Sequence, residues 1–545
     1  MRFAAALLFA CAAAAQIPAT DARNTNTPGT DTHFAMPVFQ TRAAWEAHAA
    51  RLRKQILSSA GLLPLPEKNP LRPTIFGRIE HNDYAIEKVY LETLPGYYLA
   101  GNLYRPVGRK GKLPAVLTPH GHWLYGRLEN QPLASIPARC ISLARQGYVV
   151  FAYDMVGYND TVQTPHAFGN PREQLWSFGP LGLQLWNSIR VVDFLVSLPE
   201  VDASRIAMTG ASGGGTQTFL LTAVDSRVAA SAPVNMISAI MQGGSPCENA
   251  PGLRVGTSNL EIGAMMAPRP LLMVAATGDW TRNTPREEYP AVQGIYELYG
   301  KPSQIESIQI DAPHNYNQQS REAVYRFFGN HLLGEKDPEK LKERSVRVER
   351  LPDMLVFHGR ALPANALRFD QIFDYWVDSA KRQSAGITDA PEVRERLALA
   401  LRSEWPESVL SETNGEAILL GRAGKGDRIP GQFFKGTGDA ALVLHPEGAK
   451  AARQLPAVRQ MIREGKSVLL IDAFQTGSAV APRDRSGRYF LTFNLSDDAC
   501  RVQDVLTALR FLQQTGSSRV HLVGEGKSAI WATFAASVSG VPVSL

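Results

Sequence analysis

Cysteine is scarce in this chain of 545 residues, which contains four in total. Three of them, Cys140, Cys247 and Cys500, follow the N-terminal apolar stretch, and no two stand as Cys-x-x-Cys. Three thiols are too few to form a disulfide framework in so long a chain. We expect buried apolar thiols, with one disulfide as the alternative.

Two other features are missing. Beyond the N-terminus there is no run of 18 apolar residues, which excludes an ordinary membrane-spanning helix there. No long lysine and arginine run accompanies the net charge of +6, which argues against a nucleic-acid partner. Hydrophobic residues make up 44% of the chain, which is typical of a globular protein with a large core.

The N-terminus has the pattern of a secretory signal. Met1-Arg2 is followed by the apolar stretch Phe3–Ala15, which is too short to span a bilayer stably. We predict a signal peptide over residues 1–16 and a secreted or periplasmic protein. A lipoprotein site at "LFAC" fits less well because Phe9 is atypical there. The polar residues 17–39 are predicted to form a flexible segment.

From Leu113 onward, short apolar runs alternate with helical stretches. Apolar runs without polar alternation indicate strands that are buried on both faces, and strand–helix alternation indicates a parallel sheet between helices. A helix over 42–61 and a hairpin over 84–107 precede this region. We therefore predict an α/β fold, a mostly parallel doubly wound sheet, over residues 40–335.

A second unit repeats parts of the first. The stretch 113–121 resembles 440–448, 146–159 resembles 464–477, and 191–215 resembles 505–529. Three matches in the same order favour a duplicated fold, although generic strand–helix units could also match in this way. We predict a linker and helical segment over 336–415 and a degenerate, incomplete copy over 416–545.

A Gly-x-Ser-x-Gly pattern occupies Gly210–Gly214, after a predicted strand and before a predicted helix. This arrangement is that of a nucleophile elbow, in which flanking glycines make room for a strained turn that presents the serine. We predict Ser212 as the nucleophile. The backbone N–H of Gly213 would then face a developing oxyanion.

A nucleophilic serine needs a base, and the base needs an orienting acid, in the chain order Ser, Asp or Glu, His. Asp279 follows the predicted strand 270–276, and His314 follows the predicted strand 304–310. We predict both as catalytic residues. Asp311 is a rival acid, but it stands only three residues before the histidine.

The turn after the strand at 113–118 should supply the second oxyanion donor, from the backbone N–H of His122 or Trp123. His120 and His122 could instead suggest a metal site. A His-x-His pair without a third nearby ligand is a weak metal signal, so we predict no metal and no cofactor.

Several loop residues are candidates for contact with a substrate. The loop 242–254 should overhang the site with Glu248, Asn249 and Arg254, although hydrogen bonds within the loop are the alternative. Asp154 is expected to fix its loop. The remaining candidates are Tyr158, Trp280 and Arg282. Trp280 and Arg282, together with Trp123, flank the predicted catalytic residues and could stack on a sugar ring.

The motifs "TPHGHW", "YDMVGYN", "GASGGG", "TGDWT" and "APHNYN" together resemble the α/β-hydrolase superfamily, and within it secreted bacterial esterases related to acetylxylan esterases and dienelactone-hydrolase-like proteins. The resemblance covers residues 40–335 and, as a degenerate copy, 440–545. It implies Ser212, Asp279 and His314 as the triad. Glucuronoyl esterases carry an arginine after the serine, where this chain has Gly213. The second copy has Gly526 in place of Ser212.

We therefore predict a secreted serine carboxylic-ester hydrolase that removes acetyl or similar acyl groups from a small-molecule or polysaccharide ester. An α/β-hydrolase serine peptidase is one alternative, although propeller repeats are missing here. A non-catalytic carbohydrate-binding or scaffold protein is the other.

Overall fold

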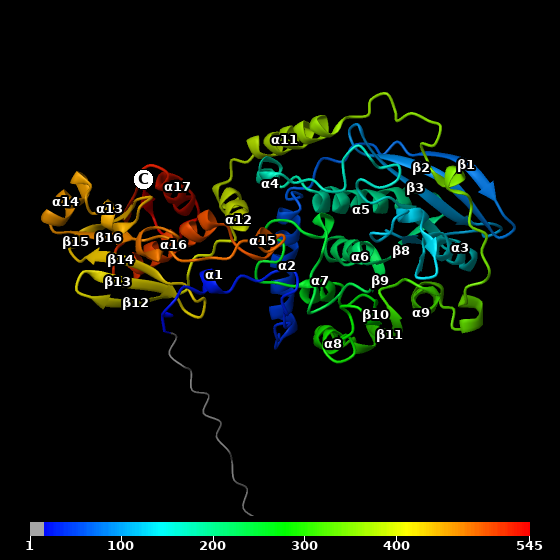
Figure 1. Ribbon diagram of the computed structural model, residues 1–545, viewed down its shortest axis with the longest axis horizontal. Coiled ribbons are helices and arrows are strands. Elements are labelled where there is room, and N and C mark those ends of the chain that lie inside the picture. The colour runs from blue at the N-terminus through cyan, green and yellow to red at the C-terminus, as the bar shows by residue number, and fades with distance from the viewer. Residues whose placement is uncertain (1–15) are drawn as a thin grey trace, which may run out of the picture. The chain divides into compact units, whose positions relative to one another are not determined.

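The computed structural model describes residues 16–545, which form two compact units (Figure 1). The large unit comprises Pro28–Ile387 and Leu491–Phe493. The described residues of the small unit are 16–27, 388–490 and 494–545. The predicted signal peptide falls almost entirely outside the described residues.

A nine-stranded sheet forms the centre of the large unit, in the order β1-β2-β3-β7-β4-β8-β9-β10-β11. Antiparallel pairing joins β1, β2, β3 and β7, and parallel pairing joins all the strands from β7 to β11. The strands are β1 (Thr74–Glu80), β2 (Tyr84–Leu94), β3 (Tyr97–Pro106), β4 (Leu113–Leu117), β7 (Val149–Tyr153), β8 (Val201–Ala211), β9 (Val228–Val234), β10 (Leu271–Gly278) and β11 (Ile305–Pro313). A separate two-residue pair is β5 (Asn130–Gln131) and β6 (Ala134–Ser135).

Helices cover both faces of this sheet because the central strands are apolar on both sides. Leu117 and Phe151 belong to one buried cluster, and Val116 and Val150 to another. The first cluster contains the apolar faces of α2 (Arg42–Ser59), α5 (Pro180–Ser197), α6 (Gly213–Val224), α7 (Asn259–Ala264), α8 (Glu288–Leu298) and α11 (Phe369–Ala385). The second contains those of α3 (Ile136–Gln146) and α9 (Gln318–Phe328). Two short helices are α4 (Pro171–Leu175) and α10 (Leu351–Met354). The predicted α/β fold is confirmed.

The small unit contains a seven-stranded sheet with the order β12-β13-β14-β16-β15-β17-β18. This order, and every parallel or antiparallel pairing in it, matches the first seven strands of the large sheet. The strands are β12 (Val409–Asn414), β13 (Ala417–Arg422), β14 (Ile429–Phe434), β15 (Thr437–Leu444), β16 (Lys466–Ile471), β17 (Val520–Gly524) and β18 (Val543–Ser544). Each of the three sequence matches falls on corresponding strands.

The core of the small unit also has two parts. On one face, α16 (Asp497–Gln514) and α17 (Ser528–Val538) pack on Leu442 and Leu469, and α12 (Ala390–Leu401) packs against this cluster. On the other face, Val443 and Leu470 contact α13 (Ala449–Ala452) and α14 (Pro456–Arg463). The remaining short helix is α15 (Phe490–Phe493).

The predicted boundaries differ from the observed units in one respect. The segment 336–415 is not a separate linker, because residues up to Ile387 belong to the large unit and those from Thr388 to the small unit. Trp376 on α11 explains why the residues up to Ile387 belong to the large unit. Its indole is buried and donates to the Trp176 carbonyl at 3.0 Å.

The N-terminal segment 17–39 was predicted to be flexible, and the structure corrects this. Arg23, on α1 (Ala22–Thr25), is mostly buried in the small unit between three carboxylates. Its guanidinium lies 2.6 Å from Asp21, 2.6 Å from Asp504 and 3.7 Å from Asp427. Composition gave no sign of this order because two of the three partners, Asp427 and Asp504, are far away in sequence.

Cys140, Cys247 and Cys500 are free thiols and are buried, so none of the cysteines among the described residues forms a disulfide. Within residues 16–545, no helix combines the length and the apolar character needed to cross a membrane.

We expect Arg23→Ala to lower the free energy of unfolding of the small unit by about 3–5 kcal/mol, because it leaves buried carboxylates without their cation. Burial raises the pKa of Asp504 to about 6 even with Arg23 in place, which indicates how costly its charge is there. Urea unfolding followed by circular dichroism measures the change.

Lys425→Ala is the matched control, since Lys425 pairs with Glu404 in the same unit while both side chains are about half exposed. A loss with Arg23→Ala no larger than that of the control would contradict this account.

Candidate active site

Ser212 stands in the turn between β8 and α6, where the sequence places its Gly-x-Ser-x-Gly pattern. Its backbone has φ of 57° and ψ of −127°, a conformation that residues with a side chain rarely adopt. The Ser212 N–H donates to the Val234 carbonyl at 3.2 Å, and its carbonyl accepts from Thr216 N–H at 2.9 Å. The serine is therefore held at the carboxyl end of the sheet in a strained turn, as a nucleophile elbow requires.

The glycines around Ser212 allow this turn because backbone lies against backbone there. A Cβ on Gly210 would lie 2.6 Å from the Gly214 carbonyl oxygen, and a Cβ on Gly214 would lie 2.7 Å from the Pro119 carbonyl oxygen. No side chain fits at either distance. The packing of β8, α6 and the end of β4 thus fixes the two outer glycines of the motif.

Asp279 and His314 meet because β10 and β11 are parallel neighbours, with a one-residue register shift after Ala276. Gly278 pairs with Pro313, so the two side chains each follow a paired residue. His314 Nδ1 lies 2.8 Å from Asp279 Oδ2, and the carboxylate side chain is only 2% exposed. The other carboxylate oxygen accepts from Thr281 N–H at 2.7 Å. Asp311, the rival acid, instead accepts from Thr277 Oγ1 at 2.7 Å.

Two tryptophans fix the His314 ring. The Trp280 ring centroid lies 4.4 Å from that of the imidazole, and the Trp123 ring stacks on it at 6.1 Å. His314 Nε2 is buried and has no hydrogen-bond partner among the described residues. Trp280 was predicted as a substrate contact; it lies against the histidine, and its indole N–H donates to the Asn235 carbonyl at 3.0 Å.

Ser212 and Trp123 share one neighbour, Gly121, in the turn after β4. The position of a Cβ on Gly121 lies 3.0 Å from Ser212 Cβ and 3.2 Å from Trp123 Nε1. The serine therefore belongs to the same cluster of side chains as His314, which Trp123 covers. Ser212 and His314 are more than 100 residues apart in sequence, and the sheet brings the ends of their strands together.

Backbone donors lie around the serine. Gly213 is the first residue of α6, and the N–H groups of a first helical turn have no acceptor within their helix. They also carry the positive end of the helix dipole. His122 adjoins them, since a Cβ on Gly213 would lie 2.6 Å from His122 Cε1. This end of α6 can therefore accommodate negative charge.

The loop 242–254 turns its charged side chains inward, which corrects the prediction of substrate contacts. Glu248 accepts from Thr216 Oγ1 at 3.0 Å, and Arg254 donates to the Glu248 carbonyl at 2.8 Å. Asn249 donates to the Gly243 carbonyl at 3.1 Å. All three are buried. Burial raises the pKa of Glu248 and lowers that of Arg254 to about 10. Glu248 thus fastens the loop to α6, and Arg254 and Asn249 hold the loop together.

Asp154 likewise fixes its own loop, in a buried cluster that sequence reasoning missed. Arg127 contacts both Asp154 and Asp160, and its Nε donates to Asn102 at 2.8 Å. Desolvation raises the pKa of Asp154 to about 6. The next candidate along this loop, Tyr158, is half-buried and packs edge-on against His120 at 5.0 Å. Arg282, the last candidate, is exposed.

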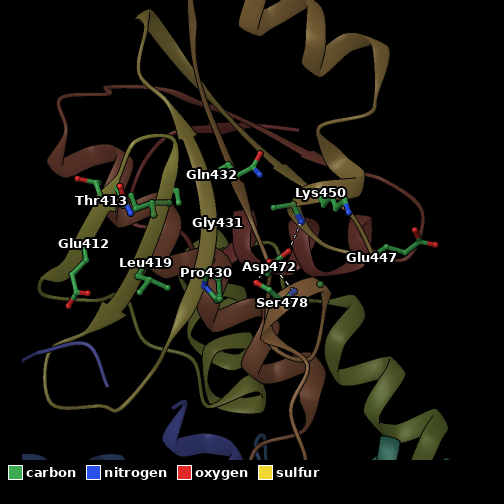
Figure 2. A pocket seen from close by; sticks show the side chains of 15 residues that line it. Glu412, Thr413, Leu419, Pro430, Gly431, Gln432, Glu447, Lys450, Asp472 and Ser478 are labelled. Carbon is green, nitrogen blue, oxygen red and sulfur yellow. Dashed lines mark hydrogen bonds between the residues drawn. The ribbon is translucent and has the colours of Figure 1, made fainter. Parts of the chain in front are cut away.

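The small unit retains the elbow's backbone without its serine. Gly526 has φ of 53°, close to that of Ser212, and a Cβ on Gly524 would lie 2.6 Å from Ala529 Cα. A cavity of about 650 Å³ lies elsewhere in this unit (Figure 2). Its lining includes Asp472, whose carboxylate accepts from Ala449 N–H at 2.6 Å. None of the predicted catalytic residues lines this cavity.

These features, a doubly wound parallel sheet with a glycine-flanked serine turn and an Asp–His pair at strand ends, define the chain as an α/β-hydrolase-type protein. Residues 78–236 match the acetyl xylan esterase (AXE1) family model. A solved structure, Methylesterase BT1017, is 30% identical; the match covers 64% of this chain and 78% of that one, with a TM-score of 0.55. The protein YtaP of Bacillus subtilis (strain 168), named as a hydrolase, is 27% identical over 257 residues, 44% of this chain and 83% of YtaP.

The chain belongs to the esterases of the α/β-hydrolase superfamily, in the same family as Methylesterase BT1017. The matched span 78–236 contains the Ser212 turn and the turn after β4, whereas Asp279 and His314 lie beyond it.

We expect Gly214→Ala to lower the free energy of unfolding by about 1–3 kcal/mol, since its Cβ has no room against the Pro119 carbonyl. Gly294→Ala is the matched control: Gly294 lies in α8 with nothing within 4 Å of its Cβ position. Alanine should be neutral or stabilising in that helix. Urea unfolding of both variants tests this, and equal stabilities would contradict the packing argument.

Proposed function

We propose that this protein is a serine carboxylic-ester hydrolase with Ser212 as nucleophile, His314 as general base and acid, and Asp279 as the orienting carboxylate. The observation that carries the proposal is the 2.8 Å contact between His314 and Asp279, in the same cluster as a serine held in an elbow turn. The chemistry of that set is acyl transfer.

In the proposed reaction, His314 Nε2 takes the proton of the Ser212 hydroxyl as the serine oxygen attacks the ester carbonyl. Asp279 accepts from Nδ1–H, which keeps the lone pair on Nε2 and stabilises the imidazolium that forms. The Gly213 N–H and the backbone of His122 or Trp123 hold the oxyanion. His314 then protonates the leaving alcohol. In the second half of the reaction, His314 takes a proton from water, the water oxygen attacks the acyl carbon, and His314 returns the proton to the departing Ser212 oxygen as the acid is released.

For the substrate, we propose an ester carried by a carbohydrate. The family model that matches is that of acetyl xylan esterases, which favours removal of acetyl or similar acyl groups. The name of Methylesterase BT1017 favours a second candidate, a methyl ester, in which the larger partner keeps the carboxylate and methanol leaves. The pattern of residues 1–16 supports secretion to the periplasm or beyond.

We expect Ser212→Ala to abolish hydrolysis of p-nitrophenyl acetate above background. Asp279→Asn should lower kcat by about 10²–10⁴-fold, because the neutral amide does not stabilise the imidazolium and its NH₂ can donate to Nδ1, which favours the wrong tautomer of His314. Initial rates with each purified variant measure both effects.

Asp311→Asn is the matched control, because this carboxylate contacts Thr277 and not His314, and its rate should equal that of the parent protein. Activity that persists in Ser212→Ala, or falls equally in the two aspartate variants, would contradict the proposed triad.

The small product that is released separates the two substrate classes. With acetylated xylan, an acetyl esterase releases acetate; with a methyl-esterified polyuronide, a methylesterase releases methanol. We expect acetate release to dominate and to vanish in Ser212→Ala. Methanol release alone would move the assignment to methyl esters, and neither product, with p-nitrophenyl acetate also untouched, would favour a binding protein.

A further inference from the structure

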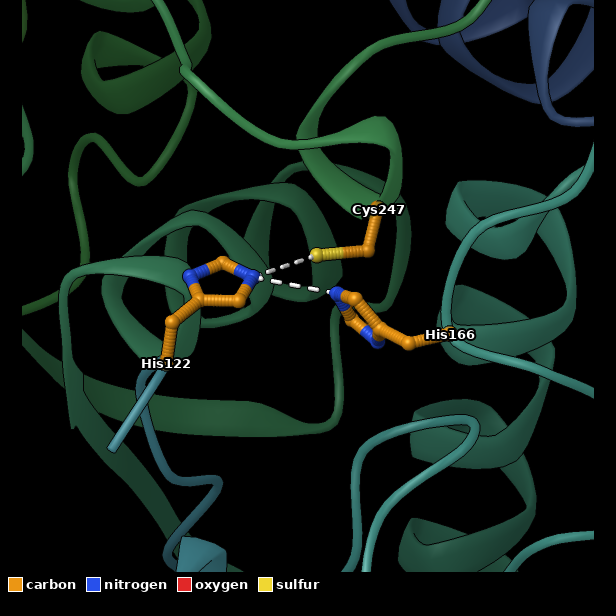
Figure 3. A group of neighbouring side chains, drawn as sticks. All are labelled: His122, His166 and Cys247. Atoms are coloured by element: carbon orange, nitrogen blue, oxygen red, sulfur yellow. Dashed lines mark hydrogen bonds between the residues drawn. The ribbon is translucent and has the colours of Figure 1, made fainter. Parts of the chain in front are cut away.

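Two imidazoles and a thiol meet beside the turn after β4, next to the elbow (Figure 3). His122 Nε2 lies 3.2 Å from His166 Nε2 and 3.2 Å from Cys247 Sγ. The three donor atoms all lie within 4.8 Å of one another. None of these three side chains has a part in the proposed ester hydrolysis, in which His122 contributes only its backbone.

Two of these donors are held in place by neighbouring groups. His166 Nδ1 lies 2.7 Å from the Val156 carbonyl, which only accepts, so Nδ1 carries the proton and Nε2 presents its lone pair to the cluster. Cys247 lies on a short 3-10 helix, Pro246–Glu248, whose Glu248 carboxylate accepts from Ser245 N–H at 3.0 Å. Such partners are what orient metal ligands in proteins.

The spacing matches a tetrahedral ion. With Zn–N near 2.0–2.1 Å and Zn–S near 2.3 Å, two ligand atoms on one zinc are about 3.3–3.6 Å apart. His122 Nε2 lies 3.2 Å from each of its two neighbours, His166 Nε2 and Cys247 Sγ, so a small outward movement would admit the ion. A thiolate with two imidazoles is a donor set that favours zinc over magnesium or calcium.

We propose that His122, His166 and Cys247 form a zinc-binding site. Binding would release the Cys247 thiol proton to water as the Zn–S bond forms, with no change of oxidation state. Three protein ligands leave a fourth position for water or for Ser245 Oγ, which lies 3.3 Å from His166 Nε2 and 3.6 Å from Cys247 Sγ. The exposed side of His122 gives the ion a route in from solvent.

The site joins three segments that are distant in sequence: the turn after β4, the loop that follows β7, and the loop 242–254. A bound ion would cross-link them beside Gly213, because the His122 ring packs over that residue. Zinc binding at this site does not depend on the proposed ester hydrolysis, so each can be tested and disproved without the other.

The test is titration of the chelator-treated full chain with Zn²⁺ by calorimetry and with Co²⁺ by absorption. We expect one equivalent of Zn²⁺ to bind, a thiolate-to-cobalt charge-transfer band, and a raised Tm. Cys247→Ser and His166→Ala should each weaken Zn²⁺ binding at least about 100-fold, and Cys247→Ser should remove the band.

Cys500→Ser is the matched control, since it removes another buried thiol from the other unit and should leave binding intact. Ser212→Ala should also bind Zn²⁺ like the parent protein, whatever its activity. Circular dichroism without metal checks that each variant is folded. Equal Zn²⁺ affinity in Cys247→Ser and the parent protein, or no binding by the folded parent, would overturn the proposal.

Discussion

The geometry of the site depends on one close approach of backbone to backbone. The first turn of α6 lies against the end of β4, and the Gly214 and Pro119 positions leave no space for a Cβ between them. Ser212, two residues before Gly214, stands in the strained turn that leads into this contact. The contact also brings the turn with His122 and Trp123 beside the start of α6. The serine, the helix N–H groups and the cover of His314 are therefore all set by the same packing.

The rest of the site comes from strand register. β10 and β11 are parallel and paired up to Gly278 and Pro313, so the acid and the histidine leave the sheet side by side. Trp280 and Trp123 both pack against the imidazole ring. The arrangement is rigid because it is built on strand ends and aromatic packing. The loops around it are held in place by side chains: Glu248 binds α6, and Arg127 binds Asp154 and Asp160.

Sequence reasoning succeeded where a local pattern has one structural outcome. Apolar runs could only be buried strands, and residues that directly follow neighbouring parallel strands, such as Asp279 and His314, must come together. It failed where side-chain direction depends on partners. Glu248 and Arg254 look like surface charges but turn inward to hydrogen bonds. His166 and Cys247 stand 44 and 125 residues from His122, and only the folded loops bring them together.

The small unit is assembled from both ends of the chain. Arg23, its mostly buried cation, precedes residues 28–387 of the large unit in sequence, while Asp427 and Asp504 follow them. During synthesis, the segment with Arg23 leaves the ribosome long before Asp427 and Asp504 exist. The cluster around Arg23 can therefore close only after residues 28–387 of the large unit have been made. A chain released before Asp504 would lack the carboxylate that lies 2.6 Å from the Arg23 guanidinium.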